Sequence, residues 1–505
     1  MEGENIFLNF SISDIQTAFK KGELTSLALV KKIANTVNED KKSALPLNDF
    51  LELYDDIFSK AEAADAEIEK ARKDGTLDSL FSKKPLLGIP FANKDNISVK
   101  GKKLTCASKI LEGYVAPYDA TVIARLEKAG AIPLGRCNQD EFAMGSSTEY
   151  SIYGPTRNPV NREYVSGGSS GGSTAAVASN NAVFALGTET GGSVRLPASY
   201  CGVYGLKPTY GTLSRWGVVA YGSSLDQVGL IAHTPSDIAL PLFAMCGQDM
   251  YDDTSSDLPK SESLLNLKAY ENFKNLRIAL PRQFIENKGM SADVATVFQN
   301  VQDWFKKKGA SIKVVDIPVL DAAVASYYVL ALAEAASNLS RFDGIRYGHR
   351  IDQGQGYDEL FIQTRSAGFG AEVKRRIVVG NYVLSEQFSG DTYKKGMTVR
   401  SRIQKEIAKV FESFDLMICP VCPTPAFKLG QKVDDPLEMY LSDLFTGFVN
   451  LARNTAISVP AGSSKDGLPI GIQFVGAMFS EPFLLQVAQS WEEEHSGCGF
   501  PLHIC

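Results

Sequence analysis

Two short stretches rich in glycine and serine are the parts of this sequence best suited to chemistry. Residues 166–173 read SGGSSGGS, and residues 190–193 read TGGS. The segment between them has the pattern of a short helix followed by an apolar strand. About eight helical residues and five or six extended ones span roughly 12 and 18 Å. We therefore expect the chain to fold back and to bring Ser193 close to Ser169.

The first stretch admits several interpretations besides a solvated loop. A Walker loop requires a lysine before its last hydroxyl residue, and this stretch has none. A nucleophile elbow, with Ser169 at the centre of G-x-S-x-G, requires a preceding strand and a histidine base. The residues before it are polar, and none of the four histidines lies beside a glycine-rich turn. A serine activated by lysine is the remaining interpretation, with Lys94, after the apolar run 85–93, as the candidate base.

Two further features decide whether this interpretation is chemically reasonable. The turn at residues 190–193 precedes a helix-like segment, VRLPASYCG, so its backbone amides suit a developing oxyanion. A lysine base near neutral pH needs a pKa about three units below its usual 10.4, which burial can provide. Without that burial, Lys94 is a strand-end lysine reaching solvent.

Composition places the chain among ordinary globular proteins. It has 505 residues, of which 44% are hydrophobic, and a formal net charge of −6, so no general basic surface for nucleic acid is expected. The first twenty residues include several charges, and we find neither a targeting segment nor an apolar run near the roughly 18 residues of a membrane helix. These features predict a cytoplasmic location, or an organelle matrix for a mature chain, and no membrane contact.

The cysteine pattern favours reduced thiols over a disulfide framework, because eight cysteines are scattered through a long chain. Cys419 and Cys422 form a C-x-x-C pair, and Cys498, His503 and Cys505 could add soft ligands. A zinc or redox site is conceivable, but the pair lies in an apolar strand without a second C-x-x-C at ligand spacing. We therefore expect no metal.

The order of predicted elements indicates an α/β protein. Helical patterns are found first, at residues 11–20, 26–37 and 49–71, and strand patterns then alternate with helices such as 119–128. The predicted strands are residues 85–93, 131–135, 181–187 and 276–281. The polar residues 248–263 are expected to form a long surface excursion, and we find no internal repeat.

The three blocks GIPFANKDN, with Lys94, GGSSGGS and TGGSVRLPAS together closely resemble the amidase signature family. The resemblance implies an α/β fold with a single large mixed β-sheet core covered by helices. It makes residues 1–505 one domain, with a helical portion (1–80), a catalytic signature region (85–235) and a part completing the sheet and substrate pocket (265–505).

The family's catalytic unit is a Ser-cisSer-Lys triad. The resemblance makes Ser193 the nucleophile and Lys94 the base, with Ser169 between them after a cis peptide bond at Gly168. The oxyanion would be held by backbone N–H groups at four positions: Thr190, Gly191, Gly192 and Ser193.

Within the family, the resemblance extends over the whole chain to glutamine-hydrolysing subunits of tRNA-dependent amidotransferases. It is carried by NQDEFAMGSSTE, GLKPTYGTLSRWGVVAYGSSLDQVG and YLSDLFTGFVNLA, among others. It implies that Arg376 and Asp443 bind the two charged groups of glutamine. Tyr327 and the Met144–Gly145 backbone would supply a pocket wall and an amide contact.

The same resemblance implies a heteromeric complex. The ammonia would pass to a tRNA-binding, kinase-type B subunit that amidates mischarged tRNA, and a small C subunit would complete the complex. ATP and Mg²⁺ would serve that partner, and this chain would need no cofactor or metal. The alternative is a stand-alone amidase acting on another small amide.

Overall fold

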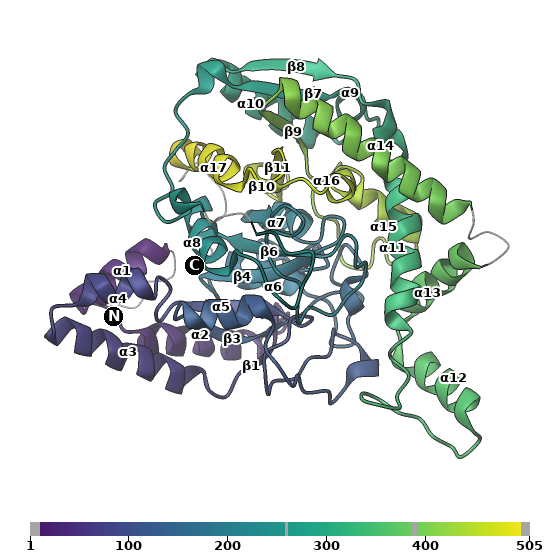
Figure 1. Cartoon of the computed structure of the whole chain (residues 1–505), viewed down its shortest axis with the longest axis horizontal. Coiled ribbons are helices and arrows are strands. Elements are labelled where there is room, and N and C mark those ends of the chain that lie inside the picture. Colours follow the sequence, from purple (N-terminus) through teal and green to yellow (C-terminus); the bar gives the residue numbers. More distant parts are fainter. Residues whose placement is uncertain (1–10, 258–260, 386–390, 496–505) are drawn as a thin grey trace.

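The computed structural model describes residues 11–257, 261–385 and 391–495, and its strands form one mixed sheet of eleven (Figure 1). The strands, in spatial order, are β1 (Phe50–Leu53), β3 (Ile132–Cys137), β2 (Pro90–Lys94), β4 (Phe184–Glu189), β6 (Gln227–Ala232), β5 (Tyr204–Lys207), β10 (Ala456–Ser463), β11 (Pro469–Val475), β9 (Leu416–Pro420), β7 (Arg277–Pro281) and β8 (Ser311–Val315). Strand β2 is parallel to both β3 and β4, and β7 is parallel to β8 and β9. The other pairs are antiparallel. The predicted α/β fold with a mixed sheet is confirmed.

Helices surround this sheet (Figure 1). They are α1 (Ile12–Lys21), α2 (Ser26–Asp40), α3 (Ile57–Lys73), α4 (Leu77–Lys83), α5 (Thr121–Lys128), α6 (Gly171–Ala178), α7 (Arg195–Cys201), α8 (Pro235–Met245), α9 (Arg282–Ile285), α10 (Ala292–Lys308), α11 (Ala323–Leu339), α12 (Tyr357–Gly368), α13 (Ala371–Leu384), α14 (Thr392–Ser413), α15 (Pro436–Tyr440), α16 (Gly447–Ala452) and α17 (Glu481–His495). Helices α1 to α4 gather on one side of the molecule, and α11 to α14 form a long flank on the opposite side.

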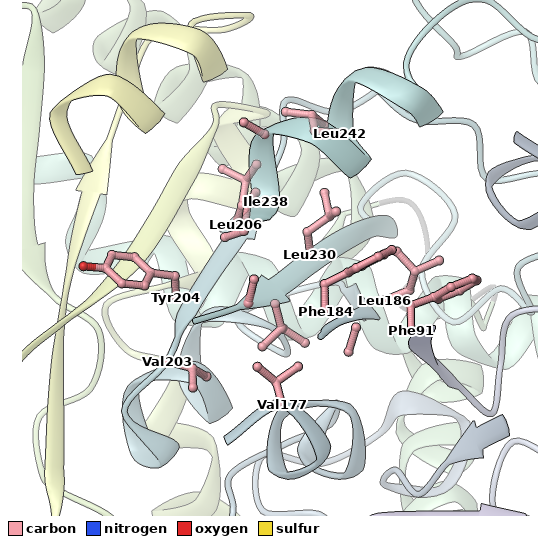
Figure 2. Packing of buried hydrophobic residues seen from close by; sticks show 14 of the residues in the cluster. Phe91, Val177, Phe184, Leu186, Val203, Tyr204, Leu206, Leu230, Ile238 and Leu242 are labelled. Atoms are coloured by element: carbon pink, nitrogen blue, oxygen red, sulfur yellow. The ribbon is translucent and has the colours of Figure 1, made fainter. Parts of the chain in front are cut away.

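The centre of the sheet is buried on both faces. Every residue of β2, β3, β4 and β6 is buried, which explains why these strands read as continuous apolar runs. Phe91 of β2 and Phe184 of β4 stack with ring centroids 5.2 Å apart. Leu186, Leu230 and the α6 residue Val177 pack in the same cluster (Figure 2). This packing holds the ends of β2 and β4, where the candidate site lies, on a rigid base.

The prediction of one helix over residues 49–71 is wrong in its first part. Residues Phe50–Leu53 form β1, an edge strand antiparallel to β3, and the helix α3 begins only at Ile57. The apolar residues of FLEL fit helical and extended spacing equally well, and pairing with an open sheet edge decided between them. The predicted strand at 85–93 begins later, at Pro90, because hydrogen-bonded turns occupy the residues before it.

One helical segment is more apolar than we expected from the sequence. Residues Pro318–Leu339, which include α11, are long and apolar enough to cross a membrane, with a mean hydropathy of 1.5 in the most apolar window. However, 67% of that window is buried inside the protein. The segment packs against α13 and α14, so its composition matches that of a core helix.

Candidate active site

The predicted catalytic residues lie at one edge of the sheet. Lys94 is the last residue of β2, and the turn at residues 190–193 directly follows β4. Because β2 and β4 are parallel neighbours, their carboxyl ends lie at the same edge. Helix α6 begins there at Gly171, directly after Ser169 and Ser170. The predicted fold-back therefore takes place, and the Ser193 carbonyl accepts a hydrogen bond from the Ser170 amide at 3.1 Å.

The Lys94 amine is held among hydroxyl groups. Its Nζ lies 2.7 Å from Ser169 Oγ and 2.9 Å from Ser170 Oγ. It is also 3.3 Å from the carbonyl oxygen of Thr188. A neutral amine has two hydrogens and one lone pair, so one of these hydroxyls can donate its proton to Nζ. This is the contact that a serine-to-lysine proton relay requires.

Burial lowers the pKa of Lys94 to about 7. The amine is completely buried, and removal from water disfavours its charged form. The negative charge of Asp140 acts in the opposite direction and keeps the pKa from falling further. A substantial fraction of Lys94 is therefore neutral near pH 7, as a general base must be.

The glycines around Ser169 allow close backbone approaches. A Cβ atom on Gly168 would lie 2.7 Å from the backbone nitrogens of Ser147 and Thr148 and would overlap the Asp140 carboxylate. The Gly168–Ser169 peptide bond is cis, as the resemblance implied. The composition of SGGSSGGS thus reflects tight packing around a fully buried loop and not the flexibility of a linker.

Ser193 is the most accessible member of the group. It is 8% exposed, whereas Lys94 and Ser169 are fully buried, so a substrate that enters from solvent meets Ser193 first. Glu189 Oε2 fixes the turn by accepting the amides of Val194 and Arg195, both at 3.0 Å. Asp226 accepts the Thr190 hydroxyl at 2.6 Å. Two buried carboxylates therefore clamp the turn whose amides are the candidate oxyanion donors.

Two alternatives from the sequence lose support here. The partner of Ser169 Oγ is a lysine amine, as required for the serine–lysine interpretation and not for a histidine-dependent elbow. No cluster of three or more histidine, cysteine, aspartate or glutamate side chains suited to a metal occurs in the described ranges. Burial raises the pKa of Cys419 to about 12 and also raises that of Cys422, which disfavours the thiolate form that binds metal. Cys498, His503 and Cys505 lie outside the described residues.

Arg376 lies at the centre of a cage of aromatic rings. It is 3% exposed, and its guanidinium carbon lies 5.2 Å from the Tyr440 ring centroid, with Tyr221 and Tyr328 at 5.9 and 6.0 Å. Its Nε donates to Glu372 Oε1 at 2.7 Å and its Nη1 to the Tyr221 hydroxyl at 3.0 Å. These contacts make Arg376 a buried cation and not a residue of a solvated helix face.

Asp443 supplies the opposite charge next to the candidate oxyanion turn. Its Oδ2 accepts the hydroxyls of Ser146 at 3.0 Å and Tyr328 at 3.1 Å. Its Oδ1 lies 3.2 Å from the place a Cβ on Gly192 would occupy. Burial raises the pKa of Asp443 to about 7, and the two hydroxyl donors act against that rise. A ligand with an ammonium group would restore its charge.

The remaining predicted pocket residues differ in how well they fit their roles. The Tyr327 hydroxyl lies 2.5 Å from the place of a Cβ on Gly191, so this ring walls the turn as expected. The Met144 amide already donates to the Glu141 carbonyl at 3.0 Å, and the Met144 side chain is core. An amide contact at Met144 is therefore not available, and Gly145 is left as the donor of that pair.

Sequence reasoning missed four residues of this site: Ser170, Asp140, Glu372 and Tyr328. Ser170 directly follows Ser169, and a signal for it was present in the doubled serine of the loop. The other three act through contacts between distant parts of the chain. Tyr328 and Asp443, for example, are separated by 115 positions, and no local pattern predicts such a pair.

Comparisons with known proteins agree with this geometry. The family model described as amidase matches residues 46–485. The chain is 54% identical to the glutamyl-tRNA(Gln) amidotransferase A subunit of Treponema denticola, over 97% of this chain and 99% of that protein. It is 46% identical to the protein of the same name from Geotalea daltonii, over 96% of each.

Solved structures give the same result. The crystal structure of the Thermotoga maritima protein of that name superposes with a TM-score of 0.76 at 35% identity and covers 97% of this chain and 96% of its own. The peptide amidase from Stenotrophomonas maltophilia superposes with a TM-score of 0.79 at 27% identity, over 97% of both chains. The family match spans most of the sequence, including all the candidate catalytic residues, and the chain therefore belongs to the amidase family.

Proposed function

We propose that this chain is the glutamine-hydrolysing subunit of a glutamyl-tRNA(Gln) amidotransferase. The observation that carries the chemistry is the Lys94 amine, buried, with a pKa of about 7 and 2.7 Å from Ser169 Oγ. The high identity to relatives of that name supports the assignment to this enzyme class. The pairing of a buried arginine with a buried aspartate supports a zwitterionic substrate, which glutamine is.

In the proposed reaction, Ser193 Oγ attacks the carboxamide carbon of glutamine. Its proton passes to Ser169 Oγ while the Ser169 proton passes to Lys94 Nζ. The amides of residues 190–193 hold the oxyanion, and each such donor is typically worth about 2.7–4 kcal/mol to the transition state. The tetrahedral intermediate collapses, and the amine leaves as ammonia with a proton returned from the relay. Water then hydrolyses the γ-glutamyl ester and regenerates Ser193.

The partner assignments belong to the same proposal. The ammonia would be used by a tRNA-binding, kinase-type B subunit that converts Glu-tRNA(Gln), or also Asp-tRNA(Asn), to the amidated form. A small C subunit would complete the complex, and ATP and Mg²⁺ would act in the partner. This chain would use no cofactor or metal and would work in the cytoplasm. The relatives are named as one subunit of an amidotransferase, which supports a heteromeric assembly.

The test is ammonia release from glutamine by the purified chain, alone and with its partner subunits. We expect release by the wild type in the complex and none above background from Ser193→Ala. The Ser193→Ala protein should keep the wild-type unfolding midpoint, because the change removes a single hydroxyl. No release by the wild-type complex would overturn the glutamine assignment.

The alternative of a stand-alone amidase rests on one finding, the structural similarity to a peptide amidase. Arg376→Ala separates the two functions. If the substrate is glutamine, the variant should lose glutamine hydrolysis while an uncharged aliphatic amide is affected far less. Equal losses on both amides would contradict recognition of a zwitterion.

A further inference from the structure

The arginine proposed to bind substrate is already ion-paired, which raises the question of what that pair does. A guanidinium carries five N–H donors in a fixed planar fork. Within the described part of the chain, two of the Arg376 donors are in use, at Nε to Glu372 and at Nη1 to Tyr221. Nη2, with both hydrogens, and one hydrogen of Nη1 are left for a ligand.

The two acceptors approach the guanidinium from different elements. Glu372 is one turn before Arg376 on α13, and Tyr221 comes from the loop between β5 and β6. Both are buried, Glu372 at 3% and Tyr221 at 2% exposure. Contacts at Nε and at Nη1 fix the plane and the rotation of the fork, so they determine which edge a substrate can reach.

Glu372 also reaches the other end of the pocket. The Tyr440 hydroxyl donates to Glu372 Oε1 at 3.0 Å. The Tyr440 ring stacks on Tyr328 with centroids 4.2 Å apart, and the Tyr328 hydroxyl donates to Asp443. A continuous set of contacts therefore joins the cation to the anion.

We infer that Glu372 is a positioning residue for glutamine recognition, which holds the Nη2 edge of Arg376 toward the substrate carboxylate at a fixed separation from Asp443. This inference rests on the proposed function and adds a residue to it. Glu372 does not touch the substrate or the reacting atoms and acts through Arg376 and Tyr440. Its loss should weaken binding of the zwitterion and leave the chemical step largely intact.

The first test compares Glu372→Ala with Glu372→Gln in the complex with the partner subunits. Alanine removes both contacts, so the KM for glutamine should rise about tenfold or more, which corresponds to about 1.4 kcal/mol, with kcat changed less than about threefold. Glutamine keeps an oxygen acceptor for Arg376 Nε and Tyr440, so its KM should stay within about threefold of wild type. In the Ser193→Ala background, the Kd for glutamine should follow the same order.

A matched control lies on the neighbouring helix. Glu406 on α14 accepts from Arg402 Nε at 2.7 Å, the same distance and the same kind of i,i+4 pair, but the Arg402 side chain is 66% exposed. Glu406→Ala should leave both KM and kcat unchanged, because an exposed pair orders nothing in the pocket.

Tyr221→Phe keeps the inference testable if Glu372→Ala does not fold. It removes only the hydroxyl that accepts Nη1 and should raise the KM for glutamine several-fold with kcat preserved. The inference is overturned if kcat falls as much as KM rises, or if neither Glu372→Ala nor Tyr221→Phe changes the KM. A wild-type complex that releases no ammonia from glutamine would instead contradict the proposed function itself.

Discussion

The protein buries two lysines whose pKa is lowered to about 7, and only one of them lies in a setting for catalysis. Lys94 ends β2 and Lys207 ends β5, and neither side chain reaches solvent. In both cases burial is the main cause of the lowered pKa. For Lys207 the positive charge of Arg195 lowers it further, and Glu189 opposes that effect.

The difference lies in what each amine contacts. Lys94 contacts two serine hydroxyls, which have protons to give. Lys207 contacts the carbonyl oxygen of Pro208 at 2.7 Å and Gln227 Oε1 at 3.2 Å, and neither oxygen has a proton. A lowered pKa therefore shows that an amine can be neutral, and the neighbouring atoms decide whether it can act as a base.

The largest effect should separate the two lysines directly. Lys94→Met removes the base and should lower kcat/KM for glutamine about 10⁴-fold or more, as losses from a catalytic unit typically do. Lys207→Met should lower kcat/KM by less than about tenfold, because its amine has no hydroxyl to deprotonate. The measurement is ammonia release at pH 8 by each variant in the complex. Equal losses from the two variants would end the distinction between the two lysines.

The pH dependence of the wild type should show two groups with glutamine and one with an uncharged amide. Protonation of Lys94 blocks the relay, so kcat/KM for a neutral aliphatic amide should fall about tenfold per unit well below pH 7. Asp443 also has a pKa of about 7, and its protonation removes the anion that attracts the glutamine ammonium. The glutamine profile should therefore fall more steeply on the acid side.

The control for this profile is Asp443→Asn, which should abolish the extra steepness and weaken glutamine binding. Asp140 and Asp226, with pKa values of about 6, remain in all variants and affect both substrates alike. Identical slopes for the two substrates would place the acid-side change in the catalytic unit alone.

Much of the catalytic unit could be predicted because its residues lie in continuous blocks. Lys94, Ser169 and Ser193 each belong to a short stretch whose composition limits the possible chemistry, and the helix and strand between the serines have comparable reach. The edge strand at Phe50–Leu53 was missed because a four-residue apolar pattern fits two periods and only the partner strand distinguishes them.

The pocket network could not be predicted for a related reason. Glu372 has a sequence-local partner in Arg376, but Tyr221 lies 155 positions from that arginine, and Ser146 lies 297 from Asp443. Such contacts depend on the packing of the long helical flank against the sheet. The lowered pKa of Lys207 was missed as well, since burial of a strand-end lysine follows from the neighbouring strands and not from its own segment.

Ser170→Ala should have a smaller effect than loss of either triad serine. Ser170 Oγ contacts Lys94 Nζ and lies 3.1 Å from the Thr188 carbonyl, so its loss removes one of the groups that orient the amine. One hydrogen bond is worth about 0.5–1.5 kcal/mol, which predicts a fall in kcat of roughly two- to twelvefold. Ser173→Ala is the matched control, because Ser173 is equally buried in the same loop and donates to Leu186 instead. A comparable loss from both variants would assign the effect to loop packing.

The smallest effect concerns stability and reads the Lys207 pKa without any catalysis. The folded pKa of about 7 lies below the usual 10.5, so between these values the unfolded chain binds more protons at Lys207 than the folded chain does. Stability from this group therefore increases with pH across that window and is lost as pH falls toward 7. The free energy of unfolding of wild type minus that of Lys207→Met should rise by about 1.4 kcal/mol per pH unit between pH 7.5 and 8.5. Urea unfolding of both proteins at several pH values measures this slope, and a flat difference would mean that Lys207 keeps its proton in the fold. In that case Lys207 would be a buried cation balanced by Glu189, and Lys94 alone would have the neutral amine that the comparison assigns to both.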